Sequence, residues 1–182
     1  MDIVGNLLIA PPAVKNNFWH KTVILVTEHH AHGSVGLVLN KRSQMSIPEF
    51  SNQLGFDIEL PGFIYVGGPV SPKNLSFLHS SDWHCSNTMQ VNDELFISSS
   101  LDMLPRMAAG DTPEYWRICL GLCGWGPGQL DAEIQGTPPW KHDTSWCVAK
   151  SSLDLVFGND HTDQWCSALD RSGLEFAQSI LT

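Results

Sequence analysis

Short apolar runs rich in β-branched residues recur over the first two thirds of the chain, and Gly, Pro, Asn or Asp residues separate them. Runs of this kind are typical of β-strands. The pattern predicts strands at residues 7–10, 22–30, 33–40, 63–66, 75–79, 89–91, 95–98, 116–123 and 146–149. A short loop joins residues 22–30 to 33–40, so we expect these two strands to pair in antiparallel orientation. The run from Val23 to Val26 is apolar without alternation, which predicts a strand buried on both faces.

A short helix is predicted after residue 46. Ser46 and Glu49 have the spacing of a capping box, in which each side chain accepts a hydrogen bond from the backbone N–H of the other residue. Phe50 and Leu54 then share one helix face, and Gly55 can end the helix.

Three other segments carry helix signals. They run from Ser100 toward Met107 with Pro105 in the first turns and Gly110 as the stop, from Gln129 through Ile134, and from Thr162 through Trp165 and Leu169 to Gly173. Because strands and helices do not alternate as they do in a doubly wound βαβ protein, we predict an α+β fold. No repeat or low-complexity linker divides the chain, so a single domain is expected over residues 1–182.

The composition predicts a large interior and an acidic surface. Hydrophobic residues make up 42% of the chain and charged residues only 16%, with a formal net charge of −9. The ten Lys and Arg residues form no cluster larger than Lys41-Arg42. Nonspecific affinity for nucleic acids comes mainly from Lys and Arg side chains that displace counterions, so the charge argues against a nucleic-acid-binding protein.

The cysteines and the amino-terminal segment favour a cytoplasmic protein. The cysteine count is five, an odd number, and no CxxC pair or zinc-ligand spacing links the residues. Asp2 stands where a signal peptide carries positive charge, and the first apolar run ends at Pro11. No stretch approaches the about 20 apolar residues that a membrane span needs. We therefore expect reduced thiols, a cytoplasmic location and no membrane segment.

Five blocks of the sequence resemble the YqgE/AlgH family of bacterial proteins, over a span from Asn6 to about Trp165. They are LLIAPP at 7–12, FWHKTVILVTEHHAHGSVGLVLN at 18–40, VGGPV at 66–70, FLH at 77–79 and GWGPGQLDAEI at 124–134. The resemblance implies a bifurcated, mostly antiparallel sheet that folds into a pseudo-barrel with short flanking helices. It implies no established activity, although some members carry a transcriptional-regulator label. Two positions depart from the usual pattern: His20-Lys21 replaces a common arginine, and Cys123 a frequent alanine.

The glycine-rich turn at the end of the last long strand is the first candidate site. Gly126 and Gly128 precede a predicted helix, whose free backbone N–H groups and dipole favour an anion. The spacing matches neither GxGxxG nor GxxxxGK, so no nucleotide fingerprint is present. The plainer interpretation is that the glycines permit a tight turn from strand to helix, and that the Trp125 ring fills the space beside it.

A second candidate is the histidine-rich segment Glu28 to His32. On a strand Glu28 and His30 would point to one face and His29 to the other, which separates possible metal ligands. HExxH is absent, so we predict no metal site. Asn40 is expected to turn the chain through its side-chain hydrogen bonds.

Three residues could carry chemistry. His79 lies beside Ser80 at the end of a predicted strand, but GxSxG is missing; Glu133 could act as a base if it faced a pocket. A structural histidine and a solvated helix carboxylate are the alternatives. Cys123, close to a helix amino terminus, could be reactive, or it could be a buried small apolar residue.

The sequence thus favours a non-enzymatic binding or interaction module, with no cofactor, whose partner is a small ligand or a protein. The predicted pocket residues are Glu28, His29, Asn40, His79, Trp125, Gly126, Gly128, Gln129 and Glu133. The alternatives are a small hydrolase or transferase with His79 or Glu133 as its base, and a transcriptional regulator. Trp19, Trp83, Trp140 and Trp165 are candidate exposed anchors for a partner.

Overall fold

The computed structural model describes residues 2–99, 101–158 and 160–181, and its central element is the long strand β9 (Trp116–Trp125). Among these residues ten strands form one curled sheet, and eight of them follow one another in the order β10-β1-β2-β3-β9-β6-β8-β7. The other two strands join it at the side, because β4 pairs with β5 and β5 pairs with β9. All pairs are antiparallel except β5–β9, which is parallel.

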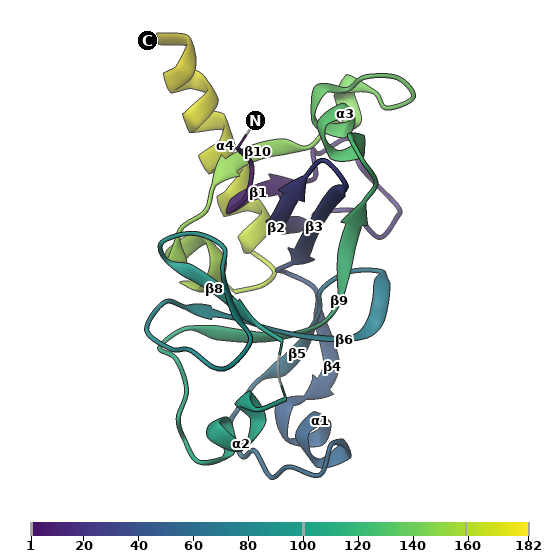
Figure 1. The fold of residues 1–182 in the computed structure, drawn as a ribbon. Helices are drawn as coiled ribbons and strands as arrows, with labels where there is room; N and C mark the ends of the chain where they lie inside the picture. Colours follow the sequence, from purple (N-terminus) through teal and green to yellow (C-terminus); the bar gives the residue numbers. More distant parts are fainter. Residues whose placement is uncertain (1, 100, 159, 182) are drawn as a thin grey trace.

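The other strands are β1 (Asn6–Ile9), β2 (Val23–His30), β3 (Gly33–Val38), β4 (Arg42–Ser46), β5 (Phe63–Val66), β6 (Val70–Ser80), β7 (Thr88–Gln90), β8 (Leu95–Ser98) and β10 (Cys147–Lys150). The helices are α1 (Ile47–Gln53), α2 (Met103–Ala108), α3 (Gln129–Gln135) and α4 (Gln164–Leu181), with a 3₁₀ turn at His142–Thr144 and a π-helical turn at Asp154–Gly158. Helices α3 and α4 lie at one end of the molecule, and α1 and α2 lie at the other (Figure 1).

Strand β9 divides the sheet into two arms. Along one edge, it pairs with β6 from Trp116 to Leu120 and again, after an irregularity, at Leu122. Along the other edge it pairs first with β5, at Cys119 and Leu120, and then with β3, from Cys123 to Trp125. The sheet is therefore bifurcated and curls into a half-barrel, and β9 runs through both arms (Figure 1).

Three glycines allow the backbones to meet where the arms separate. The Gly67 N–H donates to Leu120 O at 2.7 Å, and Gly67 O accepts from the Val38 N–H at 2.8 Å, so this residue links β9 to the end of β3. A Cβ atom added to Gly121 would lie 2.4 Å from Gly68 O, and one added to Gly68 would lie 2.2 Å from Leu122 O. Only glycine permits this approach of one backbone to another. The VGGPV motif thus has a structural explanation.

Apolar side chains from both faces of the sheet are buried. In β2, Val23 and Leu25 belong to a cluster inside the half-barrel, which β8 and α4 cover. Ile24 and Val26 face the other way and pack in a second cluster with Trp125 and α3. The prediction that this strand is covered on both faces is confirmed. A third cluster lies between α1, α2 and the arm formed by β5, β6 and β9.

The predicted α+β class and the implied bifurcated sheet are both confirmed. The capping box at Ser46 and Glu49 is present, and Pro105 lies in the first turn of α2. The hairpin of β7 and β8 also forms as expected. Ser100, the expected cap of α2, lies outside the described residues.

Four local features differ from the predictions. Strand β4 was missed because its sequence RSQMS is polar and little buried, and β6 begins five residues before the predicted strand. Gly173 does not end α4, which continues to Leu181. The helix is held on both sides of Gly173, since Ser172 donates to Val148 O and Glu175 accepts from the Lys150 N–H. Thr162 donates to Asp160, and the helix begins only at Gln164.

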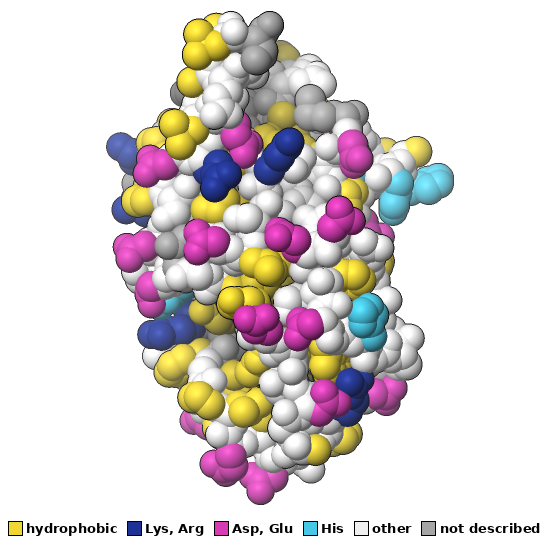
Figure 2. Space-filling view, turned by 90° about the vertical axis from the view of Figure 1, so that its left-hand side faces the viewer, with side chains coloured by type: hydrophobic (Ala, Val, Ile, Leu, Met, Phe, Trp, Pro, Cys, Tyr) yellow, Lys and Arg dark blue, Asp and Glu magenta, His cyan; other side chains and the backbone are white. Residues whose placement is uncertain are grey.

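The surface carries mixed charge. On the face shown in Figure 2, acidic side chains are interspersed with Lys and Arg, and apolar side chains are exposed near the projecting end of α4. Leu174, Phe176, Ile180 and Leu181 are the exposed apolar residues of that helix. Within the described part of the chain, no helix has the length and apolarity required to cross a bilayer.

Replacement of Gly121 tests the contact between β9 and the glycine pair. Gly121 and Gly55 both have a φ of +80°, but an added Cβ at Gly55 meets nothing within 4 Å. Gly55→Ala therefore carries only backbone strain, about 1 kcal/mol. Gly121→Ala adds a clash with Gly68 O and should lower the free energy of unfolding by about 3 kcal/mol or more. Urea unfolding of both variants measures the difference, and equal losses would show that the close contact is unimportant.

Candidate ligand-binding site

The glycine-rich turn connects the end of β9 to α3. Gly128 is the N-cap of α3 and has a left-handed φ of 67°, a conformation that glycine adopts without strain. The Gly126 N–H donates to Gln129 Oε1 at 2.9 Å. This backbone donor is therefore already satisfied. The geometry agrees with the plainer interpretation of the turn, in which glycine serves the backbone.

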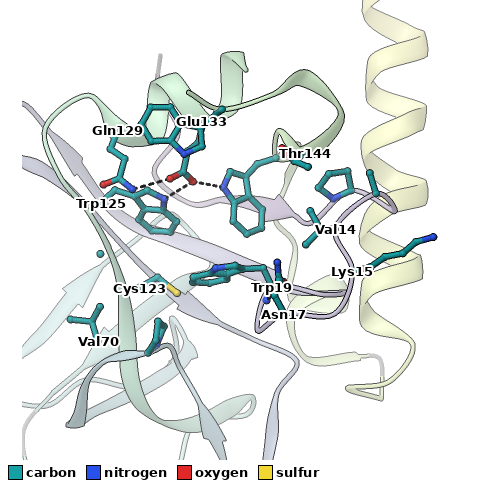
Figure 3. Close-up of a pocket in the computed structure, with 16 residues that line it drawn as sticks. Val14, Lys15, Asn17, Trp19, Val70, Cys123, Trp125, Gln129, Glu133 and Thr144 are labelled. Atoms are coloured by element: carbon teal, nitrogen blue, oxygen red, sulfur yellow. Dashed lines mark hydrogen bonds between the residues drawn. The ribbon is translucent and has the colours of Figure 1, made fainter. Parts of the chain in front are cut away.

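Glu133 is the centre of a hydrogen-bonded cluster beside this turn. Its Oε2 accepts from the indole Nε1–H of Trp125 at 3.0 Å and from that of Trp146 at 2.8 Å. Its Oε1 accepts from Gln129 Nε2 at 2.9 Å. Figure 3 shows these three donors converging on one carboxylate. The carboxylate thereby fixes the orientation of two indole rings, one at the end of β9 and one in the loop before β10.

These indole rings form part of the wall of a cavity of about 560 Å³. Its lining comes from the loop before β2, the start of β6, the end of β9, α3 and the loop before β10, and consists of Pro11, Ala13, Val14, Lys15, Asn17, Trp19, Pro69, Val70, Cys123, Gly124, Trp125, Gln129, Glu133, Trp140, Thr144 and Trp146. Trp19 packs edge-on against Trp146, with ring centroids 5.8 Å apart. Among the side chains that the structure describes, four tryptophans and one carboxylate therefore line this space.

The cavity contains an anionic group without a cationic partner. Among the described residues no Lys, Arg or His forms an ion pair with Glu133. Lys15 belongs to the lining, but its side chain points away from the tryptophans (Figure 3). All three donors to Glu133 are neutral N–H groups, which satisfy the ionised carboxylate without cancelling its charge.

Cys123 is buried beneath the cavity and is inert. Its side chain is 1% exposed, and Sγ lies 3.6 Å from Gly67 O. Burial raises the pKa of this thiol to about 12. Because the thiolate is the reactive form, the interpretation as a small buried residue holds and the interpretation as a reactive thiol does not.

The structure brings together part of the predicted set. Trp125, Gln129 and Glu133 line the cavity, and Gly126 and Gly128 shape the adjoining turn.

Three other predicted residues lie elsewhere. Glu28 Oε2 is 3.6 Å from His30 Nε2, with both side chains exposed. His29 Nδ1 is 2.8 Å from Ser34 Oγ, across the β2–β3 pair. The Asn40 side chain accepts from the Val23 N–H and donates to Lys21 O. It therefore ties the chain after β3 to the start of β2 through side-chain hydrogen bonds of the kind expected for it.

His79 is buried in the other arm of the sheet. It is 0% exposed and packs against Phe77, Trp83 and Phe96. Its Nδ1 lies 2.8 Å from Ser80 O, and its Nε2 lies 2.9 Å from Ser98 Oγ. Ser98 is also 0% exposed, so this Ser–His contact has no access for a substrate. The burial and the two hydrogen bonds of His79 agree with a structural role for this residue.

The sequence analysis missed several residues of the site. Trp19 and Trp140 were named only as possible anchors, and Trp146 only as the start of a strand. The loop at residues 11–17 carried no signal beyond its prolines. The available clue was the high number of tryptophans in the chain, seven, with Trp125 only eight residues before Glu133. Their convergence depends on pairings distant in sequence, such as β1 with β10.

Within the described ranges, no three His, Cys, Asp or Glu side chains are arranged to hold a metal ion. All five cysteines are free thiols.

The fold and the site define a small α+β protein with a half-barrel sheet and a tryptophan-lined cavity. A family model described as AlgH-like matches residues 7–177. The chain therefore belongs to the AlgH-like family. Among curated relatives, a UPF0301 protein of Shewanella loihica is 32% identical, over 98% of this chain and 96% of the relative. A UPF0301 protein of Gluconobacter oxydans is 35% identical, over 93% and 90% respectively.

Two solved structures have the same fold. The solution structure of the AlgH protein from Pseudomonas aeruginosa matches with a TM-score of 0.75 and 32% identity, covering 94% of this chain and 89% of that one. A crystal structure of a protein from Corynebacterium diphtheriae matches with a TM-score of 0.70 at 22% identity, covering 91% and 84%. Neither description states an activity.

The protonation of His79 can be checked by NMR of its ring nitrogens. Because Nδ1 faces a carbonyl, we expect the proton on Nδ1 at neutral pH. Burial lowers the pKa of His79 below its usual 6.5, so the ring should titrate below that value. Between the folded and unfolded pKa values the unfolded chain binds more protons, so this residue makes the free energy of unfolding fall as the pH drops below about 6.5. A proton on Nε2, or an unshifted titration, would contradict this assignment.

Truncation of Glu133 tests the hydrogen-bonded cluster. Glu133→Ala leaves three N–H donors without their acceptor and should lower the free energy of unfolding by about 2–3 kcal/mol. Asp131→Ala is the matched control, because Asp131 is on the same helix and its carboxylate lies 3.6 Å from His29, with 41% of the side chain exposed. That variant should change stability by less than about 0.5 kcal/mol. Equal losses in urea unfolding would refute the role of Glu133 as the anchor of the indoles.

Proposed function

We propose that this protein is a non-enzymatic binding module that holds a small ligand, or a side chain of a protein partner, in the tryptophan-lined cavity. The observation that carries the proposal is the Glu133 carboxylate, which fixes Trp125 and Trp146 in the cavity wall. A volume of about 560 Å³ lies within the range of about 300–1,000 Å³ typical of ligand pockets.

The site is organised before a ligand arrives. Indole rings supply large apolar surfaces, and the hydrogen bonds to Glu133 hold them in a single orientation. Side chains that are already ordered lose little conformational entropy on binding, so more of the contact energy contributes to affinity. Gln129 extends this order to the turn, because it connects Glu133 to the Gly126 N–H.

The enzymatic alternative has less support. A general base must accept a proton from a substrate, and the oxygens of Glu133 already accept from three N–H groups. His79 is enclosed in the other arm and is paired with Ser80 and Ser98. A hydrolase or transferase that used His79 would lose turnover in a folded His79→Ala variant, so a substrate screen on both forms discriminates between the classes.

The remaining expectations stay predictions. The net charge of −9 disfavours a transcriptional regulator that binds DNA through phosphate contacts, and binding that weakens steeply with salt would overturn this. The cytoplasmic location rests on the sequence alone.

A fragment screen followed by NMR of the indole N–H groups tests the proposed function. Ligands should shift the signals of Trp125 and Trp146 and leave those of Trp83 and Trp165 in place, since these two donate to Asp111 and to Ala10 O outside the cavity. Glu133→Ala should abolish the shifts, because the indoles are no longer held. Shifts confined to Trp83 or Trp165, or no shift with any fragment, would contradict a binding site here.

A further inference from the structure

We propose that the group recognised in this cavity is an N-alkylated cation, such as a trimethylammonium group. This inference rests on the proposed function and specifies the chemistry of its ligand. It follows from one arrangement: a carboxylate that accepts hydrogen bonds from neutral donors only, in a cavity whose lining includes four tryptophans.

The charge of the site selects for a positive ligand. The three hydrogen-bond partners of Glu133 are neutral N–H groups, so none of them offsets the charge of a carboxylate. Lys15, the one Lys or Arg of the lining, is exposed and points away (Figure 3). Interactions between charges are stronger at a partly buried site than in bulk water, and Glu133 is partly buried. The chain's net charge of −9 adds a general attraction for cations and repels anions.

The tryptophans strengthen this preference. A cation over an aromatic face is attracted by the negative face of the ring, and indole gives the strongest such contact. Trp125 and Trp146 each donate an N–H to the same carboxylate oxygen. Hydrogen bonds in a low-dielectric site polarise the groups that make them, so electron density moves toward the faces of these two rings. The same hydrogen bonds that orient the indoles therefore also make them better partners for a cation.

The cavity favours an alkylated cation over a bare ammonium or guanidinium group. A bare cation brings several N–H donors, each of which needs an acceptor when it leaves water. The acceptor sites of Glu133 are largely used by Gln129, Trp125 and Trp146. Asn17 Oδ1 accepts from the backbone N–H of Trp19, and Gln129 Oε1 accepts from the Gly126 N–H. A trimethylammonium group has no N–H to satisfy, and its methyl groups pack against indole faces.

The test compares choline with 3,3-dimethylbutan-1-ol by NMR titration of the indole signals. In this alcohol a carbon atom replaces the charged nitrogen of choline, and the shape is nearly the same. We expect choline to bind at least about tenfold more tightly than the isostere. A second arm compares choline with a short peptide that carries trimethyllysine. Tighter binding of the peptide than of choline would assign the cation to a protein partner, and the reverse would assign it to a small molecule.

Two charge-matched variants on α3 complete the test. Glu133→Gln removes the charge inside the cavity and should lower the ratio of the choline affinity to the isostere affinity about tenfold or more, because only choline interacts with that charge. Asp131→Asn removes one negative charge from the same helix outside the lining and should leave both affinities nearly unchanged. The dispersion of the indole signals shows whether Glu133→Gln keeps the cluster ordered.

The outcomes separate this inference from the proposed function. Equal or tighter binding of the uncharged isostere to the native protein would overturn the preference for a cation and would still support a binding module. The same holds if fragments from the screen bind in the cavity and neither choline nor the trimethyllysine peptide does. If no fragment and no probe shifts the indole signals, both the inference and the proposed function fail.

Discussion

The close contact between β9 and the Gly67-Gly68 pair is the constraint on which the rest of the structure depends. Where Gly121 meets Gly68, the backbones are too near for any side chain at these positions. This contact lets β9 leave one neighbour, β5, and take up another, β3, on the same edge. Without it the two arms of the sheet would have no shared strand, and the three apolar clusters would not be held together.

The candidate site is a consequence of the same strand. The end of β9 delivers Trp125 to one side of Glu133, and the segment leading to β10 delivers Trp146 to the other. Helix α3 places the carboxylate between them after a turn that needs a left-handed residue at Gly128. One acidic side chain therefore satisfies three donors and joins the end of β9, α3 and the loop before β10, which gives the cavity a defined shape and a negative charge.

Much of the fold could be predicted from the sequence because its signals are local. The capping box at Ser46, the apolar strand β2 and the β7–β8 hairpin each depend on a few neighbouring residues. Strand β4 was missed because its sequence is polar and little buried, so only its pairing with β5 makes it a strand. Helix α4 passes through Gly173 because contacts with β10 hold it. The site was predicted only around its turn. The pairing of β1 with β2 and β10 brings Trp19 and Trp146 to the cavity. The pairing of β6 with β9 places His79 in the other arm of the sheet.

Because Cys123 is buried beneath the cavity, the rate at which its thiol is labelled measures local opening of the fold. A thiol reagent can reach this sulfur only when β9 and its neighbours separate, because the side chain is 1% exposed. Cys166, exposed on α4, reacts without any such opening and supplies an internal standard in the same molecule. The ratio of the two labelling rates therefore reports how often the junction opens, and an occupant of the cavity that stabilises the closed junction would slow only the first.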